Sequence, residues 1–150
     1  MDQILAYKID IAFLVARAAL GIMFLLQGYD KIFGLGINRT ADAIYAEMLN
    51  TRLPKSLIRF AVITSSLVEL CGGLMLIAGL LVYPALMALG LDILLVIFAM
   101  SLRQPLWDMR YVWPRLVLIL LLLLLPTGND RISLDYFLNM YESANSFTGH

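Results

Sequence analysis

Three ionisable residues lie inside long apolar stretches, and their side chains are the ones best placed to do chemistry. They are Arg17, Glu69 and Asp92. A charge inside an apolar span costs roughly 3 kcal/mol or more unless it faces protein, water or an opposite charge. Helical depths, at a rise of about 1.5 Å per residue, place Arg17 within reach of both carboxylates. Because the planar arginine fork can hold a carboxylate and stays charged when buried, we expect Arg17 to pair with Asp92, with Glu69 or with both.

The charges of this trio do not cancel, because one buried cation faces two carboxylates. We therefore expect one carboxylate, Glu69 in the first place, to be protonated or to bind a cationic or hydrogen-bonding ligand. One interpretation is a polar pocket that takes a quinone headgroup or exchanges protons, with Glu69 and Asp92 as the proton-handling groups. The other is that the trio only fastens the helices together and shares a proton.

Further pocket candidates lie on the same helical faces as these charges. Arg17, Gly28 and Lys31 share one stripe of the first apolar stretch, and Ser65, Glu69 and Gly72 share one stripe of the second. Small residues such as these glycines let helix backbones approach closely in lipid. The polar residues Gln27, Asp30 and Lys31 form either a helix terminus or a second site. The candidate ligand-binding residues are Arg17, Gln27, Gly28, Lys31, Ser65 and Gly72.

The elements that must position these residues are apolar helices. Of the 150 residues, 61% are hydrophobic and only 15% are charged, whereas soluble domains carry about 25% charged residues. The sequence predicts an all-α membrane protein with a single domain, residues 1–150, folded as an antiparallel bundle of four transmembrane helices. The predicted spans are residues 11–33, 57–82, 85–102 and 112–126. The fourth is nearly pure leucine without a polar stripe, so we expect it to brace the other three from the lipid side.

Shorter features connect these spans. A short interfacial helix is predicted over residues 41–49 of the first loop, and a plain surface loop is the alternative. Tyr83-Pro84 predicts the turn between the second and third spans, and residues 133–138 predict a short amphipathic helix after the last one.

Composition excludes several kinds of function. Eleven basic and eleven acidic residues give no net charge, so nothing indicates a nucleic-acid partner. Cys71 is the only cysteine and His150, the last residue, the only histidine. The chain therefore lacks a cysteine pair for dithiol chemistry and the usual ligands of haem or a buried transition metal, and we predict no metal site.

The distribution of positive charge predicts the orientation in the membrane. Eight lysines and arginines lie in or beside the first and third loops, and two lie on the opposite side, namely Lys8 and Arg131. We therefore expect both termini on the non-cytoplasmic side.

Two runs of residues resemble the DoxX family of small bacterial membrane proteins. The first carries Arg17, Leu20-Gly21, Phe24-Leu25, Gly28 and Lys31, and the second carries Glu69-Leu70-Cys71-Gly72-Gly73 followed by Leu76 and Gly79. Ser133-Leu134-Asp135 is similar to the family's closing segment. The chain departs from the family at Gln27, where many members have a histidine, and this departure argues against a proton relay at that position.

The resemblance implies a four-helix bundle of the inner membrane, related to the quinone-reducing membrane subunit of thiosulfate oxidation. The hypothesis is therefore a quinone-interacting subunit of a membrane oxidoreductase, in which Arg17 orients a quinone carbonyl or an anionic donor. Its partners would be membrane lipid and either another redox subunit or a second copy of the chain. One alternative is a non-catalytic accessory or assembly subunit that docks another membrane protein, and a less favoured one is transport of protons or a small solute.

Overall fold

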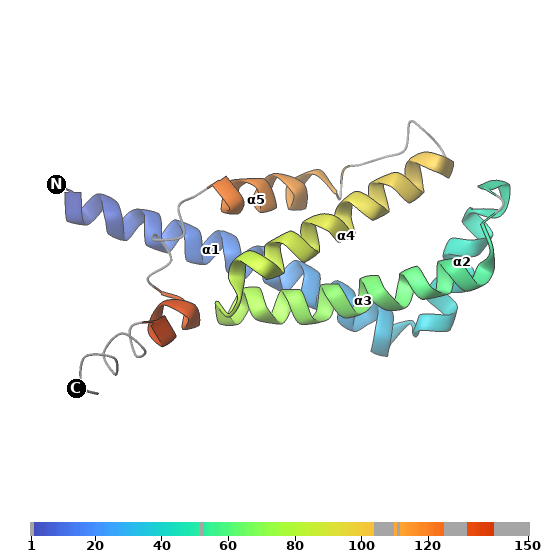
Figure 1. Cartoon of the computed structure of the whole chain (residues 1–150), viewed down its shortest axis with the longest axis horizontal. Coiled ribbons are helices and arrows are strands. Elements are labelled where there is room, and N and C mark those ends of the chain that lie inside the picture. The colour runs from blue at the N-terminus through green and yellow to red at the C-terminus, as the bar shows by residue number, and fades with distance from the viewer. Residues whose placement is uncertain (1, 52, 104–109, 111, 125–131, 140–150) are drawn as a thin grey trace, which may run out of the picture.

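The computed structural model describes residues 2–51, 53–103, 110, 112–124 and 132–139 (Figure 1). Every regular element within these residues is a helix, which confirms the all-α prediction. The elements in chain order are α1 (Asp2–Tyr29), the π-helix η1 (Asp30–Gly34), α2 (Ile37–Glu47), the 3-10 helix η2 (Leu49–Thr51), α3 (Lys55–Ala78), α4 (Val82–Arg103) and α5 (Trp113–Leu124). Residues 134–139 form one more short helix, where the sequence predicts it.

Three helices have the length and apolar character needed to cross a membrane. They are the continuous helix of α1 and η1 (Tyr7–Gly34), α3 and α4. The apolar helix α5 has 12 described residues, or about 18 Å of helix, against a hydrocarbon core of about 30 Å. The predicted span over residues 112–126 ends outside the described residues, so the fourth crossing stays a prediction.

Helices α3 and α4 form the antiparallel hairpin that the sequence predicts, but its turn lies earlier than expected. Gly79 ends α3 with a φ of 72°, and Leu81 also has a positive φ, 48°. The predicted turn at Tyr83-Pro84 is wrong, because both residues lie in the first turn of α4. Proline is tolerated there because the amide hydrogens of a first helical turn have no partner within the helix.

Helix α1 packs most extensively against α3, and glycines set the distance between the two. A Cβ atom at Gly73 would lie 2.5 Å from the backbone nitrogen of Leu25, and one at Gly28 would lie 2.6 Å from that of Leu70. The two backbones therefore touch. Because the helices are antiparallel, a residue nearer the N-terminus of α1 lies opposite a residue nearer the C-terminus of α3. This register fixes which polar residues meet.

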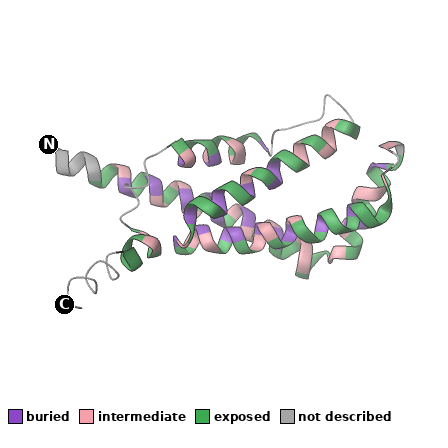
Figure 2. Ribbon diagram, viewed as in Figure 1, coloured by how far each residue is buried: buried purple, intermediate pink, exposed green. Residues whose placement is uncertain are grey.

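The main core lies among α1, α3, α4 and α5, and Figure 2 shows buried residues on the faces that these helices turn toward one another. Its fully buried side chains include Leu20, Phe24, Leu76, Leu89 and Ile119. The outward faces carry many exposed leucines and phenylalanines, as expected for helices surrounded by lipid.

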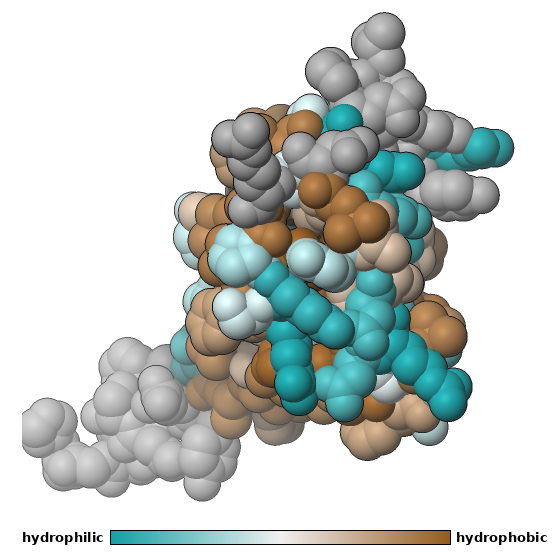
Figure 3. Space-filling view, turned by 90° about the vertical axis from the view of Figure 1, so that its right-hand side faces the viewer, coloured by the Kyte–Doolittle hydropathy of each residue, from teal (hydrophilic) through white to brown (hydrophobic). Residues whose placement is uncertain are grey.

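A second, smaller core joins α2 to the N-terminal half of α3. It consists of Ala41, Met48, Ile58 and Val62. The helix predicted over residues 41–49 is thus present, although it begins at Ile37 and ends at Glu47. Figure 3 shows hydrophilic residues gathered at this end of the molecule, flanked by hydrophobic ones. The ion pairs Lys55–Asp42 and Arg103–Glu47 also belong to this region.

Candidate functional site

Glu69 is the centre of a buried polar cluster between α1 and α3. Its side chain is only 1% exposed. Its Oε1 atom accepts hydrogen bonds from Gln27 Nε2 at 2.7 Å and from Lys31 Nζ at 2.8 Å, and its Oε2 atom lies 2.7 Å from the same Nζ. Gln27 and Lys31 are four residues apart, so a single helical face presents both to the carboxylate.

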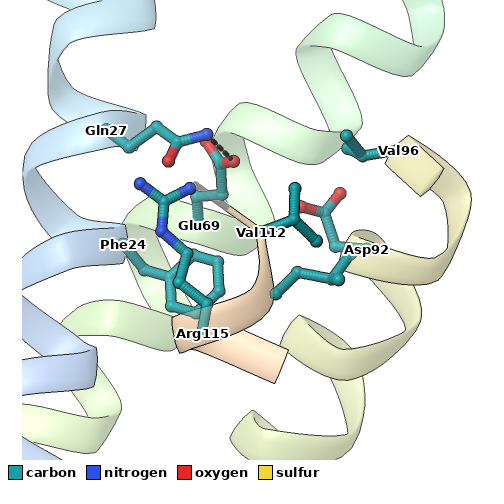
Figure 4. Close-up of a pocket in the computed structure, with 8 residues that line it drawn as sticks. Phe24, Gln27, Glu69, Asp92, Val96, Val112 and Arg115 are labelled. Carbon is teal, nitrogen blue, oxygen red and sulfur yellow. Dashed lines mark hydrogen bonds between the residues drawn. The ribbon is translucent and has the colours of Figure 1, made fainter. Parts of the chain in front are cut away.

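Helices α4 and α5 complete the cluster from the other side. Asp92 of α4 is 6% exposed, and Ser65 of α3 lies beside its carboxylate. Arg115 of α5 lies with its guanidinium carbon 5.6 Å from the centre of the Phe24 ring, a distance suited to a cation–π contact. Figure 4 shows the side chains of Gln27, Glu69 and Arg115 directed toward one another.

A cavity of about 30 Å³ lies among these side chains. Its lining residues are Phe24, Gln27, Glu69, Asp92, Ile93, Val96, Val112 and Arg115. Four buried polar atoms of the lining residues have no hydrogen-bond partner among the described residues, namely Gln27 Oε1, Glu69 Oε2, Asp92 Oδ2 and Arg115 Nε, and of these Glu69 Oε2 has the Lys31 ammonium beside it. Each such atom costs roughly 1–3 kcal/mol if it stays unpaired. A cavity of this size holds one or two water molecules, so the geometry indicates a place for water or for a polar atom of a ligand.

The cluster is balanced in charge, which corrects the expectation of excess negative charge. Lys31 and Arg115 are the two cations, and Glu69 and Asp92 are the two carboxylates. The expectation assumed that Arg17 was the only cation available. Lys31 supplies the positive charge next to Glu69, so the carboxylate needs no further cationic ligand.

Arg17 lies elsewhere, and the prediction that it pairs with Glu69 or Asp92 is wrong. It is 1% exposed, donates from Nη2 to the carbonyl of Ile132 at 3.0 Å and packs against the backbone of Gly79. Gly79 follows Glu69 by ten residues in the chain, which is about 15 Å along a helix. The glycine contacts between α1 and α3 fix the register of the two helices, and this register places Arg17 opposite the end of α3. The estimated depth of Arg17 in the membrane does not reveal this position.

The structure brings together five predicted site residues and separates the other three. Gln27, Lys31, Ser65, Glu69 and Asp92 meet around the cavity or beside it. Of the group at the end of the first span, Gln27 and Lys31 belong to the Glu69 site, whereas Asp30 is exposed and takes no part in it. Gly28 contacts the backbone of α3, and Gly72 contacts Leu89, so both pack helices together instead of lining the cavity.

Sequence reasoning missed one residue of the site, Arg115. Arg115 follows Trp113-Pro114 at the start of an apolar helix and reads as a charge flanking a loop, yet it lines the cavity. The helix has no polar stripe, as expected, but it contributes this one charged side chain to the cavity.

The C-terminal segment 132–139 forms a second polar cluster around the α3–α4 turn. Both carboxylate oxygens of Asp135 accept backbone hydrogen bonds, from Leu81 N at 2.9 Å and from Val82 N at 3.1 Å. The Asp135 amide donates to the Gly79 carbonyl at 3.0 Å. Asp135 thus caps the start of α4 from outside the helix, and Arg17 holds the same segment through Ile132.

Replacing Asp135 with alanine is expected to lower the free energy of unfolding by about 1–2 kcal/mol, because two amide hydrogens at the start of α4 lose their acceptors. Unfolding by SDS in mixed micelles measures this change. Asp42→Ala is the matched control, since it removes an exposed carboxylate from an ion pair. Equal midpoints for the two variants would show that the cap contributes nothing.

Comparison with known proteins identifies a family. The sequence model of the DoxX family matches residues 12–102, which is more than half of the chain and extends from α1 through nearly all of α4. Arg115 and the segment 132–139 lie beyond the matched residues. A comparison with curated proteins and one with solved structures each give no match. The family match and the three long apolar helices lead to one conclusion: this chain is a membrane protein and belongs to the DoxX family.

Proposed function

We propose that the protein is a quinone-interacting subunit of a membrane redox system, and that the Glu69 cluster is its ligand site. One observation carries the proposal: a buried, charge-balanced cluster lines a cavity in which Gln27 Oε1, Asp92 Oδ2 and Arg115 Nε have free hydrogen-bonding capacity. A quinone carbonyl accepts hydrogen bonds, and Arg115, which lines that space, has in Nε a donor without a partner among the described residues. We therefore propose that Arg115, and not Arg17, orients the quinone carbonyl.

The volume of the cavity limits how such a ligand could bind. About 30 Å³ is far smaller than the apolar cavity of about 150 Å³ that holds a benzene ring in another protein. The cavity therefore suits a carbonyl oxygen and not a whole ring. In the proposed complex the ring lies against the apolar wall of Ile93, Val96 and Val112, and α4 and α5 move apart to admit it.

The membrane arrangement is part of the same proposal. The chain would cross the bacterial inner membrane four times, with both termini on the non-cytoplasmic side. The Lys31 side chain, 19% exposed, would then mark the cytoplasmic side of the site. Another redox subunit or a second copy of the chain would be the electron-transfer partner.

Quinone binding by the purified full-length chain tests this proposal. A short-chain benzoquinone and a short-chain naphthoquinone would be titrated into the protein in lipid nanodiscs, with native mass spectrometry to count bound ligand. Arg115→Gln is expected to weaken binding tenfold or more, because a charge-assisted hydrogen bond contributes about 1.5–3 kcal/mol. Arg103→Gln is the matched control, since it removes an exposed arginine from the surface pair with Glu47.

The accessory-subunit alternative has one observation in its favour. Glu69 already has close partners at both oxygens, Gln27 and Lys31, as expected for a group that fastens α1 to α3. No binding of either quinone, together with a stable complex between the chain and another membrane protein, would replace the redox proposal with this one.

A further inference from the structure

We propose that Asp92 is the carboxylate that exchanges protons at this site, through water in the cavity, and that Glu69 is a positioning residue. The inference concerns the same residues as the proposed function and deepens it. From the sequence alone, proton handling is assigned to both carboxylates. Here the proton exchange is assigned to Asp92 alone.

The contacts of the two side chains differ. Glu69 Oε1 receives hydrogen bonds from Gln27 and Lys31, and Oε2 lies 2.7 Å from the Lys31 ammonium. Its geometry is fixed by two residues on one face of the continuous α1–η1 helix. Asp92 has Ser65 beside it, while its Oδ2 atom is buried and has no partner among the described residues. Glu69 Oε2 also lacks a hydrogen bond, but the Lys31 ammonium occupies its side, whereas Asp92 Oδ2 has neither a hydrogen bond nor an ion pair among the described residues. Asp92 Oδ2 is therefore the carboxylate oxygen where a proton can arrive.

The cavity supplies the carrier for that proton. Its volume of about 30 Å³ is sufficient for one or two water molecules. A stable buried water has 2–4 polar partners, and the lining offers Gln27 Oε1, Asp92 Oδ2 and Arg115 Nε for them. Each transfer moves one proton between a water oxygen and Asp92 Oδ2, and no electron or heavy atom changes place.

The charged groups around Asp92 come from each helix that packs on it. Helix α3 contributes Ser65 and Glu69, the α1–η1 helix contributes Lys31, and α5 contributes Arg115. Two of these are cations and one is a carboxylate, so removal of any of them also changes the field at Asp92. Variants that alter the cavity and leave every charge in place are therefore the sharpest test.

Infrared spectroscopy of the full chain in lipid nanodiscs tests the assignment without any quinone. The band to follow is the C=O stretch of a buried protonated carboxyl group during a pH titration. We expect Asp92→Asn to abolish this band and Glu69→Gln to retain it. Loss of the band only in Glu69→Gln, its loss in both variants, or its retention in both would overturn the division of roles.

A cavity-filling variant then tests the water. Val112→Ile adds one methylene to the cavity wall and changes no charge. It is expected to slow the exchange of the band from H₂O to D₂O at least tenfold, because the carrier is displaced. Val117→Ile is the matched control, since residue 117 lies in α5, the helix that begins directly after Val112, and is 54% exposed. Equal exchange rates in Val112→Ile, Val117→Ile and the wild type would contradict a water carrier.

These outcomes separate this inference from the proposed function. A protein that binds no quinone but shows the Asp92 band and the Val112→Ile effect would retain the proton-exchanging site and lose the redox proposal. A protein that binds quinone but shows neither effect would retain the redox proposal and lose the proton-exchanging role of Asp92. If Glu69→Gln does not fold, Ser65→Ala replaces it: this change is expected to shift the midpoint of the Asp92 band, and an unchanged midpoint would contradict the assignment.

Discussion

Gly73→Ala is expected to lower the free energy of unfolding by about 3 kcal/mol, at the upper end of the range for overpacked cores. The added Cβ atom would lie 2.5 Å from Leu25 N and 2.7 Å from Gly21 O. Both contacts are to backbone, which cannot rotate away as a side chain can. Helices α1 and α3 would have to separate, and Lys31 and Gln27 would then move away from Glu69. SDS-induced unfolding, followed by circular dichroism, measures the loss.

Gly90→Ala is the matched control for this substitution. Gly90 also lies inside a long apolar helix, but a Cβ atom there meets only Ile119 Cγ2, at the ordinary contact distance of 3.5 Å. Because alanine favours the helix over glycine by about 1 kcal/mol, this variant is expected to be as stable as the wild type or more so. Equal stability of the two variants would mean that the α1–α3 backbones do not touch as described.

The sequence predicts the helices well because the length of an apolar stretch and the glycines that end it are local signals. The long apolar stretches and the short helix near residue 135 are present in the structure. The prediction also selects Glu69, Asp92, Lys31 and Gln27 as polar residues of interest, since charges within apolar helices stand out in any sequence.

What the sequence leaves undetermined is the register between helices. Whether Arg17 or Lys31 meets Glu69 depends on where the α1 and α3 backbones touch, and this depends on Gly73 fitting against Leu25. Helical faces and depths are compatible with either pairing. Arg115 is missed for a related reason: only the packing of α5 against α1 and α4 turns a charge at a helix start into part of the cavity wall.

Lys31→Met is expected to lower the free energy of unfolding by roughly 3 kcal/mol, because it leaves the Glu69 carboxylate buried without its ion-pair partner. The estimate is the lower end of the range for buried pairs, since the Lys31 side chain is 19% exposed and water can partly replace it. Methionine keeps most of the length of the lysine stem, so the change mainly removes charge. The same SDS titration measures the effect.

A double-mutant cycle separates the pair from its surroundings. Lys31→Met combined with Glu69→Gln should recover at least half of the lost free energy, because the stranded charge is gone and the new amide can still bond to Gln27. The exposed pair Lys55–Asp42, about 58% exposed on each side, provides the comparison: Lys55→Met is expected to cost less than about 1 kcal/mol. A Lys31→Met variant no less stable than Lys55→Met would place Glu69 in contact with water. The buried cluster would then be too hydrated to hold the α1–α3 register, and the contact of Gly73 with Leu25 would have to hold it alone.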